Sequence, residues 1–92
     1  MLRFDWDPAK AASNEEKHGV SFSEAATAFG DPLSITIPDP AHSEGEARFV
    51  LLGLSFRNRL VVVAHVEDEN AIRIISARPA SNAECRSYEQ EE

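Results

Sequence analysis

The 92-residue sequence contains a single cysteine, Cys85, and lacks an apolar run long enough to cross a membrane. One cysteine cannot form an internal disulfide bond or a cysteine-based structural zinc site. Residues 1–6 alternate like a strand and show no charged-then-apolar leader. We therefore expect a soluble, cytoplasmic protein. Its length suits one small domain spanning residues 1–92.

Basic residues are also scarce, because 9 lysines and arginines face 16 acidic residues and the net charge is −7. This balance argues against a broad nucleic-acid surface, since phosphate binding usually requires a basic one. The charge is unevenly distributed, however. Residues 48–80 contain five basic and three acidic residues, and the segments on either side are acidic. The acidic N-terminal region would suit a basic protein partner better than RNA.

Local signals divide the first half of the chain into four elements. Alternation over residues 2–6 predicts a short strand, and Asp-Pro then predicts a helix over residues 8–18, ended by Gly19. A serine and a glutamate with capping-box spacing begin a second helix over residues 21–29, with apolar positions at helical spacing. Residues 33–37 alternate as a second strand.

The second half is dominated by strand patterns. Residues 49–56, 60–66 and 71–77 are mostly apolar, and a tight turn is expected at Arg57-Asn58. A second capping box starts a sparse final helix near residue 81. The sequence thus predicts an α+β fold, with a short N-terminal strand, two helices, a four-strand mainly antiparallel meander and a C-terminal helix. The simplest arrangement places the helices on one face of the sheet.

The strand pattern of residues 71–78 carries two arginines. Strict alternation would place Arg73 and Arg78 on opposite faces. A guanidinium beside an apolar strand needs solvent, a carboxylate or a ligand anion. Two interpretations stay open: the arginines bind phosphate, or they form structural ion pairs with Glu67, Asp68 or the acidic last helix.

Several blocks together carry a family resemblance: Phe4-Asp5-Trp6-Asp7, Ala9-Lys10-Ala11, Asn14, Lys17-His18-Gly19-Val20-Ser21-Phe22, Glu24-Ala25-Ala26, Asp31-Pro32 and residues 72–78. Nearly end to end, the chain resembles the BrnT family of bacterial toxins. The resemblance implies a RelE-like ribonuclease toxin of a type II toxin–antitoxin system, which cleaves RNA without a metal and inhibits translation. It also implies a hetero-oligomer with a BrnA-like antitoxin, which would supply any contact with DNA.

The chain departs from the family pattern near its C-terminus. Family members usually continue after residue 78 with a lysine and a basic run, whereas Pro79, Asn82 and Cys85 stand here and only Arg86 remains. This departure leaves an alternative function open. The protein could be a catalytically weakened toxin-fold module that retains antitoxin binding.

Metal-independent RNA cleavage requires cations and one or two titratable groups. The predicted catalytic residues are therefore Arg73, Arg78, His65 and Lys17, and the predicted RNA-binding residues are Arg57, Arg59, Lys10 and Tyr88.

Plainer roles also remain open for some of these residues. Lys10 and Lys17 share a helix face that could simply be solvated, and Tyr88 could anchor its helix in the core. His18 is expected to interact with its helix end. His42 and its acidic neighbours form only a weak metal motif, so we expect no metal and no other cofactor.

Overall fold

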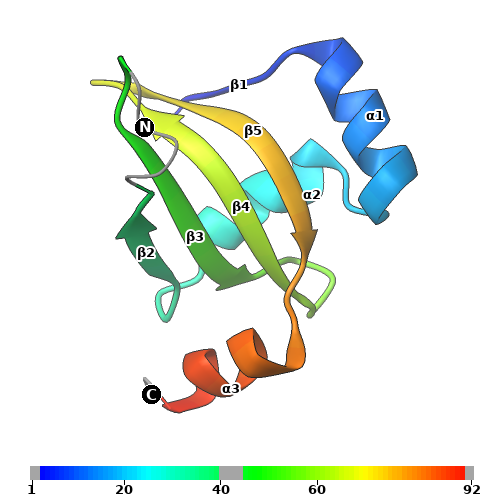
Figure 1. Cartoon of the computed structure of the whole chain (residues 1–92), viewed down its shortest axis with the longest axis vertical. Helices are drawn as coiled ribbons and strands as arrows, with labels where there is room; N and C mark the ends of the chain where they lie inside the picture. The colour runs from blue at the N-terminus through cyan, green and yellow to red at the C-terminus, as the bar shows by residue number, and fades with distance from the viewer. Residues whose placement is uncertain (1–2, 40–44, 91–92) are drawn as a thin grey trace.

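The computed structural model describes residues 3–39 and 45–90 (Figure 1). It confirms the predicted α+β class and the order of the elements. No helix in these two ranges is long and apolar enough to span a membrane. Along the chain the elements are β1 (Arg3–Asp5), α1 (Pro8–His18), α2 (Phe22–Thr27), the 3-10 turn η1 (Ala28–Gly30), β2 (Ile35–Pro38), β3 (Arg48–Leu54), β4 (Leu60–Glu67), β5 (Ala71–Pro79) and α3 (Asn82–Gln90).

The described strands form one sheet in the order β1-β5-β4-β3-β2. Strands β2 to β5 make the predicted antiparallel meander. β1 joins the far side of β5 in parallel, with Phe4 opposite Ile72. The first strand of the chain therefore lies beside the last one.

The helix boundaries follow from their capping residues. The Asp7 side chain accepts a hydrogen bond from the backbone N–H of Ala9 at the start of α1, and Gly19 ends α1 with φ of 72°. Ser21 caps α2 by accepting from the N–H of Glu24. The β3–β4 turn is wider than predicted, because the backbone N–H of Ser55 bonds the carbonyl of Arg59 across it.

β5 contains an irregularity that the sequence pattern did not indicate. The register with β4 shifts at this point, and Ile75 has no partner on β4. Arg73 lies opposite Val66, and Arg78 lies opposite Val62. The two valines are four residues apart and share a face, so both arginines lie on that same face. The prediction of opposite faces is wrong, because one extra residue reverses the alternation.

The two faces of the sheet are covered differently. α2 lies behind the sheet in Figure 1 and α1 lies beside β5, and we call this side the helix-covered face. α3 lies by the other side, the open face, where Arg78 binds Glu84. The expectation that all helices share one face is therefore wrong for α3. The core on the helix-covered face consists of Val20, Phe22, Ala25, Ala28, Leu51, Val61, Val63, Ile72, Ile74 and Ala77.

Candidate functional site

α1 replaces a strand along part of the outer edge of β5. β1 pairs only with the first three residues of β5, and α1 packs beside the remainder. The buried Asn14 amide donates to the carbonyl oxygens of Ala77 at 2.8 Å and Val20 at 3.0 Å, and its Oδ1 accepts from the N–H of Ala77 at 3.1 Å. One side chain thus completes the strand edge and fixes a polar helix. No role was predicted for Asn14 from the sequence, although a lone asparagine in a helix without an apolar stripe was a usable signal.

A hollow of about 220 Å³ lies between α1 and β5. Cations and hydroxyls dominate its lining, and none of the described residues that line it is a carboxylate. The structure therefore brings Lys10 and Lys17 together, as their helical spacing predicted, and adds His18 and Ser76. We call this hollow the cationic hollow; its lining residues are Lys10, Ser13, Asn14, Lys17, His18, Ile75 and Ser76.

The two arginines of β5 lie on either side of the irregularity, and each is paired with a carboxylate. Arg73 Nη2 is 2.6 Å from Glu46 Oε1, and both side chains are about half exposed. Arg78 binds Glu84 through two hydrogen bonds of 2.8 Å. The hydrogen bonds from Arg78 lower the pKa of the Glu84 carboxyl to about 2, and the same pairing raises the pKa of Arg78.

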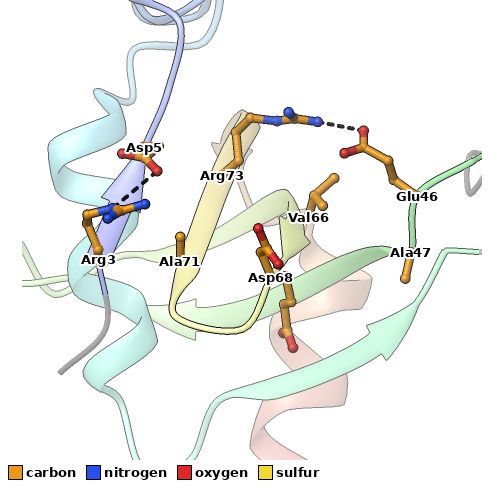
Figure 2. A pocket seen from close by; sticks show the side chains of 9 residues that line it. Arg3, Asp5, Glu46, Ala47, Val66, Asp68, Ala71 and Arg73 are labelled. Atoms are coloured by element: carbon orange, nitrogen blue, oxygen red, sulfur yellow. Dashed lines mark hydrogen bonds and ion pairs between the residues drawn. The ribbon is translucent and has the colours of Figure 1, made fainter.

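The surroundings of Arg73 are acidic overall (Figure 2). A hollow of about 360 Å³ beside it has two arginines and four carboxylates in its lining. A phosphate that binds Arg73 must therefore displace Glu46 against the repulsion of the other carboxylates. Within the described ranges no cluster of three or more histidine, cysteine or acidic residues could hold a metal ion. His42 and Glu44, part of the weak metal motif, lie outside those ranges.

His65 lies in the core rather than at a surface. Its side chain is fully buried between the rings of Phe29 and Phe49, at centroid distances of 4.8 and 5.9 Å. Nδ1 is 3.2 Å from the carbonyl oxygen of Val63, and Nε2 is 3.0 Å from a carboxylate oxygen of Glu67. A ring in this position cannot contact RNA, so the geometry gives no support to the predicted catalytic role.

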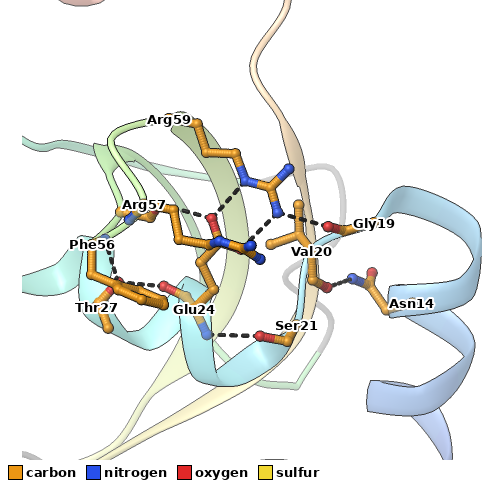
Figure 3. Close-up of polar contacts among 10 residues, drawn as sticks. Asn14, Gly19, Val20, Ser21, Glu24, Thr27, Phe56, Arg57 and Arg59 are labelled. Carbon is orange, nitrogen blue, oxygen red and sulfur yellow. Dashed lines mark hydrogen bonds and ion pairs between the residues drawn. The ribbon is translucent and has the colours of Figure 1, made fainter.

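Arg59 is held by a buried carboxylate (Figure 3). Its Nε and Nη2 donate to the two oxygens of Glu24, each at 2.6 Å, and Nη2 also donates to the carbonyl of Gly19 at 2.7 Å. The Glu24 side chain is 2% exposed and accepts a further bond from Ser55. The hydrogen bond from Arg59 lowers the pKa of Glu24. Arg59 therefore ties three elements together, whereas Arg57 stays exposed.

Tyr88 takes the plainer of its two predicted roles. Its side chain is buried, and its hydroxyl donates to Asp31 Oδ2 at 2.6 Å. The residue thus anchors α3 to the turn before β2. A tyrosine in this position is not available for stacking on a base.

The comparison with protein families shows to which family the chain belongs. The family described as "Ribonuclease toxin, BrnT, of type II toxin-antitoxin system" matches residues 6–84. The chain belongs to the BrnT family. Members of this family are ribonuclease toxins of type II toxin–antitoxin systems, and such a system implies an antitoxin protein as partner.

The structural comparison agrees with the family match. The crystal structure of the Brucella abortus ribonuclease toxin BrnT superimposes with a TM-score of 0.69 at 21% sequence identity, covering 89% of this chain and 100% of that one. This likeness supports the BrnT fold specifically rather than the broader RelE-like label. No protein with curated annotation is similar enough in sequence to count as a relative.

The BrnT match also places the cationic hollow within the family region. Residues 6–84 include all of α1 and all of β5, and they end in the first turn of α3. The departure from the family pattern begins at Pro79 and includes Asn82, both inside the match, and only its last part, from Cys85 onward, lies beyond it.

Proposed function

We propose that the protein is a metal-independent endoribonuclease that inhibits translation by cleaving RNA and is neutralised by a BrnA-like antitoxin. Family membership supports the ribonuclease and toxin parts of this proposal. The cationic hollow carries the proposal at residue level, because the described residues that line it include two lysines and a histidine and no carboxylate. A polyanion such as RNA would be attracted to these cations, whereas the chain as a whole is acidic.

The hollow offers the groups that cleavage of RNA requires. In this reaction a base removes the 2′-hydroxyl proton, the 2′-oxygen attacks phosphorus, and the leaving 5′-oxygen receives a proton. We assign the phosphate to Lys10 and Lys17, whose ammonium groups would stabilise the charge on the pentacoordinate phosphate. His18 lines the same hollow, and an imidazole can exchange protons near neutral pH.

Arg73 and Arg78 are assigned as flanking phosphate contacts. Each already holds a carboxylate, so an RNA phosphate would have to replace Glu46 or Glu84. Exposed ion pairs contribute only about 0–1 kcal/mol, so this exchange costs little. Phosphate also matches the planar, forked geometry of a guanidinium.

A second candidate function is a weakened toxin that binds its antitoxin without cleaving RNA efficiently. The pairing of both β5 arginines with carboxylates favours it. The two functions make different predictions for the purified protein. Only the first requires RNA cleavage in the presence of EDTA.

The test uses the purified full-length chain with a labelled RNA in EDTA, together with induced expression in bacteria lacking the antitoxin. We expect cleavage and growth arrest from the parent chain. The double variant Lys10→Ala/Lys17→Ala should cleave about 100-fold more slowly, as expected for loss of transition-state charge stabilisation.

Arg86→Ala is the matched control, because it removes an exposed cation from α3, away from the hollow. It should retain full activity. Undiminished cleavage by the double variant would contradict the assignment of the hollow. Intact RNA and normal growth with the parent chain would favour the weakened module.

A further inference from the structure

The open face of the sheet is apolar over β2, β3 and β4. A hollow of about 290 Å³ lies there, and α3 forms one of its walls. We call it the apolar groove. Ile37 is its most accessible apolar residue, with 56% of the residue exposed. The groove is lined by Ile35, Ile37, Val50, Leu52 and Val62 from the sheet and by Glu84 and Ser87 from α3.

The strand beside the groove has a free edge. β2 is the last strand in the sheet order, so within the described part of the chain no strand pairs with its outer side. An apolar surface next to an open strand edge is a common setting for binding an extended or helical segment of another protein. The cationic hollow uses neither feature, because it lies beside β5, toward the edge of the sheet opposite to β2.

The charges around the groove favour a basic occupant. Asp39 directly follows β2, and α3 contains Glu84 and Glu89 against one arginine, Arg86. The whole chain carries a net charge of −7. A second copy of this acidic chain would be repelled, whereas a segment carrying lysine and arginine would be attracted.

We propose that the antitoxin docks in the apolar groove, through an apolar segment flanked by lysine or arginine residues. The identity of the occupant as the antitoxin rests on the proposed function. Glu84 lines the groove and also holds Arg78. A docked segment therefore lies against the pair that keeps Arg78 occupied, and it covers the open face next to the proposed RNA site.

The test measures binding of the antitoxin encoded in the same operon to the full-length chain by calorimetry. Ile37→Glu places a charge in the groove and adds to its acidic surroundings. It should weaken antitoxin binding by about 30-fold, as for loss of an interface hot spot. The exposed position of Ile37 leaves the fold intact, which a thermal melt checks. RNA cleavage by Ile37→Glu without antitoxin should equal that of the parent.

Phe56→Glu is the matched control, because Phe56 is 69% exposed and is not part of the groove. It should bind the antitoxin like the parent. Equal binding by the parent and Ile37→Glu would overturn the groove assignment and leave the proposed function standing. A parent chain that cleaves RNA but binds no antitoxin would overturn both the groove and the antitoxin part of the proposed function.

Light scattering tests the remaining candidate occupant, which is a second copy of this chain. A parent chain that dimerises at micromolar concentration, and that Ile37→Glu makes monomeric without changing antitoxin binding, would assign the groove to a second copy. That result would also overturn the proposal.

Discussion

The two faces of the sheet hold arginines in pairs of the same length but in different surroundings. On the helix-covered side, Arg59 contacts Glu24 at 2.6 Å, and the Glu24 side chain is 2% exposed. On the open face, Arg73 contacts Glu46 at 2.6 Å, and the Glu46 side chain is 53% exposed. A distance alone therefore does not distinguish a structural arginine from one that can exchange its partner.

The difference in burial has a direct energetic meaning. Removing one partner of a desolvated pair leaves a charge that neither water nor protein satisfies. Removing one partner of an exposed pair costs little stability, because water solvates the charge that remains. Arg59 is consequently fixed in the fold, whereas breaking the pairs of Arg73 and Arg78 costs little stability, as the proposed phosphate contacts require.

The largest effect is expected from breaking the pair between Arg59 and the buried Glu24 carboxylate. Arg59→Ala leaves the Glu24 carboxylate, 2% exposed, with Ser55 as its remaining side-chain donor and should lower the free energy of unfolding by about 3 kcal/mol. Arg73→Ala, the matched change on the open face, leaves Glu46 53% exposed and should lower it by less than about 1 kcal/mol. Urea denaturation of both variants measures the comparison. Equal losses would show that the two pairs do not differ as their burial indicates.

A smaller effect is expected at the strand edge completed by α1. Asn14→Asp keeps the size of the side chain but cannot donate to the carbonyls of Val20 and Ala77. It should lower the free energy of unfolding by about 2 kcal/mol, because two buried acceptors lose their donor. Hydrogen exchange of the α1 amides should rise first. Ser13→Asp, a neighbouring change at an exposed position, is the control; if it costs as much stability, the loss does not come from the edge contact.

The smallest effect concerns the exposed pair that holds α3. Because the folded-state pKa of Glu84 is lowered to about 2 from 4.5, its contribution is present above pH 4.5 and is lost as the pH falls toward 2. The change should stay below about 1 kcal/mol, since the pair is partly exposed. NMR shifts of α3 amides should follow this titration, with those of α1 as reference. In Glu84→Gln the α3 titration should disappear, and its persistence would assign it to another group.

The local parts of the fold were predictable because their signals act over a few residues. Asp7, Gly19 and Ser21 set helix ends by bonding backbone groups within one turn, and all three were recognised. The meander of β3 to β5 was predictable for a similar reason, because each strand is a mostly apolar run bounded by a polar turn. The position of Lys10 and Lys17 on one face of α1 followed from helix geometry alone.

The remaining features depend on contacts between distant segments. The unpaired Ile75 has no sequence signature, and it decides on which face the two arginines lie. The partners of Arg59 and Arg73 are 35 and 27 residues away along the chain. His65 illustrates the same limit, since a histidine on a strand can face either water or the core. The packing of Phe29 and Phe49 against the ring places His65 in the core.

The sequence by itself determined the α+β class, the helix ends and the resemblance to the BrnT family, because capping bonds and hydrophobic periodicity are local properties of the chain. Only the tertiary structure decided which carboxylates the arginines contact and on which face of the sheet Arg73 and Arg78 lie. The irregularity in β5, the Asn14 contact and the docking of α3 arise from packing between segments far apart in sequence, and that packing pairs Arg59 with a buried carboxylate but Arg73 and Arg78 with more exposed ones.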